Sequence, residues 1–310
     1  MRRRQEREQE KRRNKAGSVL SSLVMIIALG VFCFAGYKLV TIYLDYKEGV
    51  DEYNKLEMFA DTQKNTEGFD EELMEENDTM ADEWGDEAVL DEGKGTRVFE
   101  VMENPIDFAS LQSLNPDVIG WLEMEAIDIN YPIVQGKDND YYLHRTFQKV
   151  DNFSGSIFLD YMNRADFSQR NNIVYGHNMK NGSMFGSLKR YREKEVFEKS
   201  HYFWIYTRNR IYKYEIFACS EVSKFGPDYQ YTFGKKEDYL EFLYHAKDQS
   251  LIDTGVEVGA NDTIVTLSTC TGNDATRFIV QGKRVRTYEA VPKSGGYETE
   301  AAETEKKEQE

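Results

Sequence analysis

Three side chains that could carry out nucleophilic chemistry stand at the ends of strand-like runs. Cys270 ends the run Val265-Thr-Leu-Ser-Thr-Cys270, His177 follows the run Asn172-Ile-Val-Tyr-Gly176, and Arg277 opens the run after the cysteine. A cysteine attacks as its thiolate, and histidine is the usual base that generates one. A guanidinium can donate to the oxyanion of an acyl-transfer transition state. Together the three residues predict acyl transfer through a cysteine nucleophile.

Each of these residues also has a plainer interpretation when it is taken alone. A cysteine at a strand end is most often a buried apolar side chain, and a histidine in a turn usually faces water. Cys219 lies inside a strand-like run and is expected in the core, while Cys33 lies in an apolar run and is expected to face lipid. The same plain interpretation holds for the other histidines, His144, His201 and His245.

Metal and disulfide chemistry are not expected. The three cysteines form no CxxC pair, and no histidine stands at ligand spacing from another, so the sequence does not predict a zinc site. Three cysteines also make a poor disulfide framework. We therefore expect no metal site.

The residues that must position this chemistry lie in a mainly β segment, 96–292. Short runs rich in Ile, Val, Tyr and Phe, bounded by Gly, Asn and Asp, predict strands. Helices are predicted at 107–114, where Asp107 can cap, at 184–192, and at 235–246, where apolar residues mark one face. Many short strands with few helices predict a closed or sandwiched antiparallel sheet. The predicted strands are 127–134, 155–160, 172–175, 202–206, 211–222, 263–268 and 277–285.

A membrane-spanning helix is predicted at 16–37. These 22 residues carry no charge, and a helix of that length spans roughly 33 Å, enough for a hydrocarbon layer of about 30 Å. The segment 1–15 holds eight Lys/Arg against three Glu, so the positive-inside rule places the N-terminus in the cytoplasm and the rest outside. A cleaved signal peptide and a buried core helix are the alternatives.

The remaining segments are acidic. Residues 45–95 hold nineteen Asp/Glu against four Lys, and 38–95 is interpreted as an extracellular stalk across which few contacts should reach the 96–292 domain. The tail 293–310 holds six Glu against three Lys and has a disordered composition. The 96–292 domain has no basic excess, and nucleic-acid binding requires a Lys/Arg patch, so no nucleic-acid partner is expected.

The motifs together resemble the sortases, the bacterial cysteine transpeptidases, and are closest to class B. Thr-Leu-Ser-Thr-Cys270 is followed seven residues later by Arg277, and Tyr-Gly-His177-Asn-Met lies upstream. The resemblance covers about residues 98–288, and the predicted 235–246 helix matches the extra helix before the cysteine strand in class B. Further segments that match in order are 115–122, 129–135, 138–143, 155–160 and 182–186.

The resemblance implies a closed eight-stranded β-barrel with an N-terminal helix, and a catalytic site of Cys270, His177 and Arg277 that needs no cofactor. It implies cleavage of a C-terminal sorting signal, of an NPxTN-like kind, in a secreted surface protein. The product is a thioester at Cys270, whose acyl group passes to a peptidoglycan-precursor amine. Ser268 and Thr269, which flank the nucleophile, are expected either to line the substrate groove or to have a structural role.

Three alternatives stay open. One is a hydrolytic cysteine peptidase with the same site, another is a pilin-polymerising sortase, and the third is a non-enzymatic, membrane-tethered binding protein on a sortase-like barrel. The predicted topology places a single-pass protein in the cell membrane, with the catalytic domain outside. The resemblance implies that the cell is a Gram-positive bacterium.

Overall fold

The computed structural model describes residues 2–61 and 99–293, in two compact units that meet between residues 48 and 49. The first unit consists of most of the helix α1 (Arg2–Leu56). A stretch of α1 that begins at Leu23 is long and apolar enough to cross a membrane, and its side chains are exposed, as at Phe32 and Leu39. The acidic segment 62–95 and the tail 294–310 lie outside the described residues.

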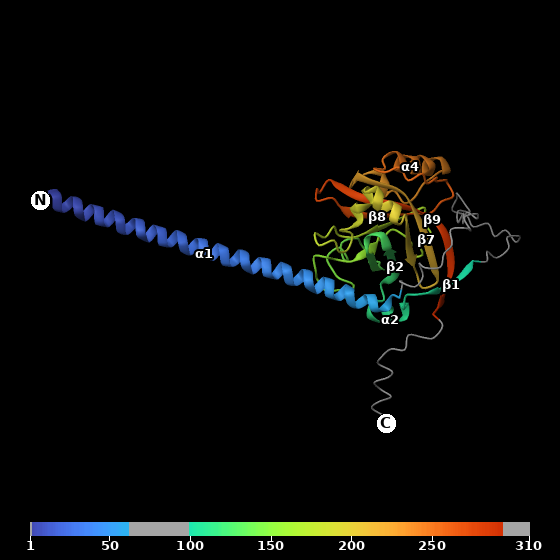
Figure 1. The fold of residues 1–310 in the computed structure, drawn as a ribbon, viewed down its shortest axis with the longest axis horizontal. Helices are drawn as coiled ribbons and strands as arrows, with labels where there is room; N and C mark the ends of the chain where they lie inside the picture. The colour runs from blue at the N-terminus through green and yellow to red at the C-terminus, as the bar shows by residue number, and fades with distance from the viewer. Residues whose placement is uncertain (1, 62–98, 294–310) are drawn as a thin grey trace, which may run out of the picture. The chain divides into compact units, whose positions relative to one another are not determined.

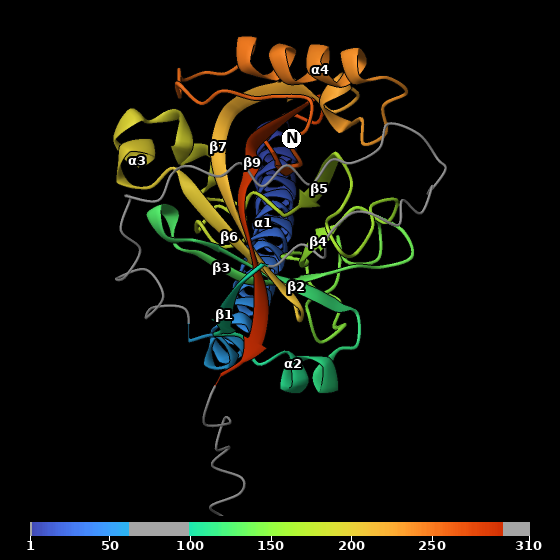
Figure 2. The ribbon, with the colours of Figure 1, turned by 90° about the vertical axis from the view of Figure 1, so that its right-hand side faces the viewer.

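The second unit is built on a closed ring of eight strands (Figures 1 and 2). The ring follows the order β9-β7-β6-β2-β3-β4-β5-β8, and β8 closes it by pairing with β9, while β1 adds to β9 outside the ring. This confirms the predicted closed eight-stranded barrel. The strands are β1 (Glu100–Asn104), β2 (Val118–Met124), β3 (Ile129–Val134), β4 (Ile157–Leu159), β5 (Asn171–Tyr175), β6 (Tyr202–Tyr206), β7 (Arg210–Ser223), β8 (Ile264–Cys270) and β9 (Thr276–Pro292).

Two helices lie outside the strands of the barrel. Figure 2 shows α4 (Lys236–Asp248) at the top of the view and α2 (Phe108–Leu114) at the bottom. Asp107 caps α2 as predicted, because its carboxylate accepts from the Ser110 amide at 3.0 Å. The short elements are α3 (Lys194–Lys199) and the 3-10 helices Glu57–Phe59, Glu125–Ile127, Leu188–Arg192 and Pro227–Tyr229.

The helix predicted at 184–192 is wrong in its first half. Only Leu188–Arg192 is helical, and it forms a 3-10 helix. Met184 has a φ of +53°, a left-handed conformation that does not occur inside an α-helix. The chain therefore turns at Met184 before the short helix begins.

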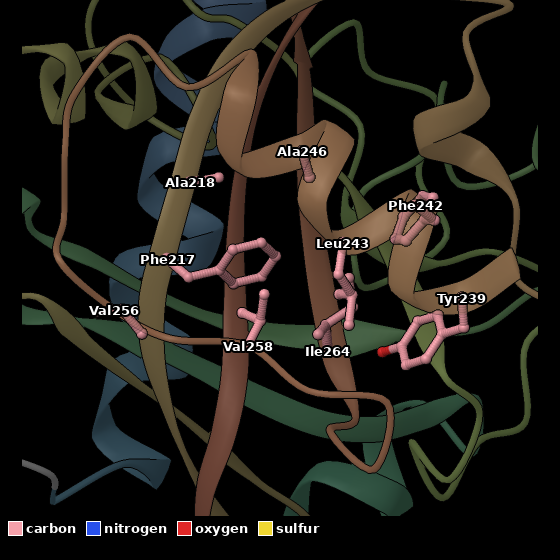
Figure 3. Packing of buried hydrophobic residues seen from close by; sticks show 9 residues of the cluster. All are labelled: Phe217, Ala218, Tyr239, Phe242, Leu243, Ala246, Val256, Val258 and Ile264. Carbon is pink, nitrogen blue, oxygen red and sulfur yellow. The ribbon is translucent and has the colours of Figure 1, made fainter. Parts of the chain in front are cut away.

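The helix α4 packs on the outside of the barrel. Its predicted apolar face contacts β7 and the start of β8, and the cluster continues into the segment that connects α4 to β8 (Figure 3). This burial anchors the chain immediately before the strand that ends in Cys270. The cluster consists of Phe217, Ala218, Tyr239, Phe242, Leu243, Ala246, Val256, Val258 and Ile264.

The end of α1 belongs to the barrel unit. Tyr53 and Leu56 are buried, and the chain after the helix bonds to the segment that leads into α2, from the Asp107 amide to the Phe59 carbonyl oxygen at 2.9 Å. The Lys293 ammonium also contacts the Asp61 carboxylate. The expectation that few contacts cross from the stalk to the domain is therefore wrong for residues 49–61. Two apolar side chains one helical turn apart are buried against the barrel instead of facing water.

We predict that Leu56→Ala in a 49–293 fragment lowers the free energy of unfolding by about 2–4 kcal/mol, since it leaves a cavity at a fully packed site. The matched control is Met58→Ala, because Met58 is 74% exposed two residues away, and its effect should stay below about 0.5 kcal/mol. Urea denaturation measures both. Equal effects of the two substitutions would contradict the packing of this segment on the barrel.

Candidate active site

The pairing of β8 with both β5 and β9 brings the three predicted residues to one end of the barrel. Cys270 is the last residue of β8 and stands opposite Arg277 in the antiparallel register with β9. On the other side, β5 runs parallel to β8 with Tyr175 opposite Ser268, so His177 follows at the level of Cys270. Asn178 joins the two strand ends, because its side-chain amide donates to the Cys270 carbonyl oxygen at 2.7 Å.

The imidazole of His177 is held by a backbone carbonyl. Its Nε2 lies 2.7 Å from the carbonyl oxygen of Leu143. A carbonyl only accepts, so Nε2 carries a proton and Nδ1 is the nitrogen left to exchange one. Burial lowers the pKa of His177, and the bond to Leu143 opposes that shift. The ring is thus fixed in one tautomer.

The two cysteines of the barrel differ in access. The Cys270 thiol is partly exposed, whereas Cys219 is fully buried and its Sγ lies 3.4 Å from the Tyr191 carbonyl oxygen. Burial raises the pKa of Cys219 to about 11, so this thiol stays protonated at neutral pH. Cys219 is a core residue, as predicted, and Cys270 is the barrel thiol that solvent can reach.

The guanidinium of Arg277 bonds to its own loop. Its Nη1 donates to the carbonyl oxygens of Thr276 at 2.8 Å and Asp274 at 3.3 Å. Beside it, Tyr229 stacks on Tyr175, with 6.3 Å between ring centroids. Burial raises the pKa of Tyr229 to about 12, while the charge of Arg277 lowers it and that of Cys270 raises it. Tyr229 therefore lies within electrostatic reach of both groups.

Ser268 and Thr269 are buried beneath the site. The Ser268 hydroxyl shares a 2.8 Å hydrogen bond with the Tyr229 hydroxyl, and Thr269 Oγ1 donates to the Gly176 carbonyl oxygen at 2.7 Å. These bonds hold Tyr229 and the residue before His177. Of the two roles left open by the sequence, the contacts favour the structural one.

Sequence reasoning missed several supports of the site. Leu143 acts through its carbonyl oxygen, which leaves no trace in the residue type. Tyr229 is 41 residues from Cys270 and is brought close by the fold. Asn178 could have been found, since it follows His177 directly and carries two donors. Among residues 23–61 and 99–293, no cluster of three His, Cys, Asp or Glu side chains could hold a metal ion.

We predict that iodoacetamide at neutral pH alkylates Cys270 of the 49–293 fragment and leaves Cys219 unmodified. The buried, protonated thiol of Cys219 has neither solvent access nor thiolate character. Peptide mass mapping measures the two sites, and alkylation in urea, where both should react, is the control. Faster modification of Cys219 than of Cys270 in the folded protein would contradict this assignment.

Comparisons with known proteins agree with the fold. The family model described as the sortase domain matches residues 122–285. A sortase B of Listeria monocytogenes is 33% identical over 277 residues, which cover 87% of this chain and 99% of that protein. A sortase B of Staphylococcus aureus is 32% identical over 163 residues, which cover 53% of this chain and 67% of that protein.

Solved structures of sortase B resemble this one. The crystal structure from B. anthracis in complex with AAEK1 has a TM-score of 0.61 and 32% identity, covering 79% of this chain and 99% of that one. The structure from Clostridium perfringens has a TM-score of 0.55 and 35% identity, covering 58% of this chain and 100% of that one. The chain therefore belongs to the sortase family of cysteine transpeptidases, in class B.

Proposed function

We propose that this sortase cleaves the C-terminal sorting signal of a secreted surface protein, forms a thioester at Cys270, and transfers the acyl group to a peptidoglycan-precursor amine. The observation that carries the proposal is the meeting of an accessible thiol, a histidine of fixed tautomer and an arginine at one end of the barrel. Class B membership supports the cell-wall transpeptidase activity itself.

The proposed reaction passes through two tetrahedral intermediates. His177 Nδ1 takes the proton of the Cys270 thiol, and the resulting thiolate attacks the scissile carbonyl carbon and forms a C–S bond. The C–N bond then breaks as Nδ1 gives that proton to the leaving amine. The incoming amine then attacks the thioester carbonyl, loses a proton to Nδ1, and releases the thiolate. Nε2 keeps its proton throughout because Leu143 accepts from it.

In this proposal Arg277 stabilises the oxyanion of both intermediates. Its position opposite Cys270 supports the role, and its Nη1 bonds to loop carbonyls leave other guanidinium donors for the oxyanion. Tyr229 interacts electrostatically with both Cys270 and Arg277, and it would line the space that the oxyanion occupies between them.

For the substrate, we propose a sorting signal of the NPxTN-like kind. Support comes from the class B relatives, one of which, from Staphylococcus aureus, has been solved as a sortase B–substrate complex. A pilin-polymerising enzyme would use the same site with a different amine, so the acceptor is the point that an assay must resolve.

We also propose that residues 16–37 anchor the enzyme in the cell membrane, with the N-terminus in the cytoplasm and the catalytic domain outside. Support comes from the exposed apolar surface of α1, from the basic 1–15 segment and from the acidic residues that follow. Residues 38–48 would then lie between the membrane span and the barrel unit, which begins at residue 49.

The decisive experiment is mass spectrometry of the protein incubated with a sorting-signal peptide library, with and without an added amine such as triglycine. We expect an acyl adduct on Cys270 and an amine-dependent transfer product. Cys270→Ala should abolish the adduct and keep the fold, while Cys219→Ala should retain the adduct. Hydrolysis that is indifferent to the amine would favour the peptidase alternative, and an adduct in Cys270→Ala would refute the nucleophile.

We predict that Arg277→Ala lowers kcat by about 10²–10³-fold, the usual effect of losing one oxyanion donor, and that Arg277→Lys recovers only part of the rate. Steady-state kinetics on the selected peptide measure the change, with circular dichroism to confirm folding. Arg286→Ala is the matched control, because Arg286 lies in the same strand nine residues further from Cys270. A change of less than about threefold in Arg277→Ala would remove Arg277 from the mechanism.

A further inference from the structure

The last turn of α1 contacts a loop that reaches the catalytic histidine. We call residues 142–156 the histidine-support loop, because Leu143 within it accepts from His177 Nε2. Tyr53 is buried against this loop, and its hydroxyl donates to the Gly155 carbonyl oxygen at 2.8 Å, with Ser156 Oγ a second acceptor at 3.1 Å. The neighbouring Glu52 carboxylate accepts from the Gln148 amide at 2.8 Å. The helix therefore holds the loop at its base and at its tip.

Inside the loop, Ser156 fixes the chain on both sides of Leu143. Its amide donates to the Tyr142 carbonyl oxygen at 2.9 Å, and its Oγ donates to the Arg145 carbonyl oxygen at 2.7 Å. Gly155 lies directly against Leu143, since a Cβ added at Gly155 would stand 2.5 Å from the Leu143 carbonyl oxygen. A shift of residues 155 and 156 must therefore move the carbonyl that orients His177.

The ring of Tyr53 also contacts Tyr131, which is connected by hydrogen bonds to the segment that holds Cys270. It packs edge-on against Tyr131 of β3, with 5.4 Å between centroids and 89° between planes. The Tyr131 hydroxyl accepts from the Met184 amide at 3.2 Å, and Met184 pairs with Asn178. Asn178 in turn donates to the Cys270 carbonyl oxygen. One side chain thus braces the segments that hold His177 and Cys270.

A tyrosine here is not explained by packing alone. A phenylalanine would fill the same volume without the free-energy cost of burying a hydroxyl, which hydrogen bonds must offset. Burial raises the pKa of Tyr53 far above the physiological range, so the hydroxyl remains a donor. The hydroxyl is therefore committed to the base of the histidine-support loop.

We propose that Tyr53 is a positioning residue for His177, acting through the Gly155–Ser156 bonds and the Leu143 carbonyl, so that the end of the N-terminal helix sets the orientation of the catalytic histidine. This inference rests on the proposed function, in which His177 transfers protons. It assigns a role in the reaction to a residue more than a hundred positions before His177, on a helix outside the barrel.

The test compares Tyr53→Phe with the unmodified full-length protein in detergent micelles. The substitution keeps the ring and removes the hydroxyl, so the protein should fold. Loss of one neutral hydrogen bond corresponds to roughly a three- to tenfold change, which we expect as a fall in kcat with KM within about twofold. Tyr244→Phe is the matched control, because Tyr244 is 51% exposed on α4, and its kinetics should not change.

The second readout is the NMR titration of the His177 ring, assigned from a His177→Gln variant. A weaker bond to the Leu143 carbonyl disfavours the charged ring, so the titration midpoint in Tyr53→Phe should move to lower pH. The charged or titratable groups on the elements around His177 are His144 in the loop, Cys270 on β8 and Arg277 on β9. Tyr53→Phe changes none of them, and His201 and His245 serve as internal references.

Ser156→Ala provides an independent check, since it removes the hydroxyl that connects Tyr53 to the Arg145 carbonyl oxygen beside Leu143. The double variant with Tyr53→Phe should lose less activity than the product of the two single losses, because both act through Leu143. A lower melting temperature with unchanged kcat and unchanged His177 midpoint would reduce Tyr53 to a structural role and overturn the proposal. The titration needs no turnover, so a protein without transpeptidase activity would refute the proposed function while the titration still decides the role of Tyr53.

Discussion

The arrangement of the whole site depends on one strand, β8, which is hydrogen-bonded to β5 on one side and to β9 on the other. A row of buried side-chain bonds crosses these three strands: Thr266 Oγ1 donates to Asn171 Oδ1 at 2.7 Å and accepts from Gln281 Nε2 at 3.2 Å. A polar group left unpaired in the apolar interior costs free energy. These side-chain bonds therefore fix the register of β8 against β5 and β9. A one-residue slip of β8 would turn every side chain to the opposite face and separate Cys270 from its partners.

Hydrogen bonds to backbone carbonyl oxygens position the candidate catalytic groups. Thr269 holds the carbonyl of Gly176, Leu143 holds the imidazole, and Asn178 holds the carbonyl of Cys270. Each of these bonds is short; the Thr269 bond is buried and the other two are partly buried. A hydrogen bond is stronger away from water, and a missing partner there costs more free energy. The thiol and the guanidinium remain partly exposed at the same end of the barrel, so rigidity beneath the site is combined with access above it.

Contacts outside the barrel extend this support. The α4 cluster anchors the segment that enters β8, and the last turn of α1 packs on the histidine-support loop. The boundary of the catalytic unit therefore lies near residue 49, well before the first strand of the barrel. A helix that contains an apolar, membrane-length stretch ends as a packed part of the catalytic unit.

The sequence by itself determined the local features, because each depends on neighbours along the chain. Strand-like runs placed Cys270, His177 and Arg277 at their ends, Asp107 marked the start of α2, and helical spacing marked the buried face of α4. The resemblance carried by the motifs added the closed barrel and the family. Only the tertiary structure decided the features that depend on distant partners. The strand β2 was missed because it is buried on both faces and lacks alternation, and β1 because it is a short, exposed edge.

Dependence on distant partners also explains why the residues that support the site were not predicted. The burial of Ser268 and Thr269 follows from what packs over β8, and the role of Leu143 follows from a carbonyl oxygen that every residue possesses. Tyr53 and Leu56 are buried by contacts with the distant barrel, which an acidic composition along the chain does not indicate, so this segment was interpreted as part of the stalk. Residue types and spacing determine which reactive side chains are available. Pairing and burial between distant segments determine which groups position those side chains.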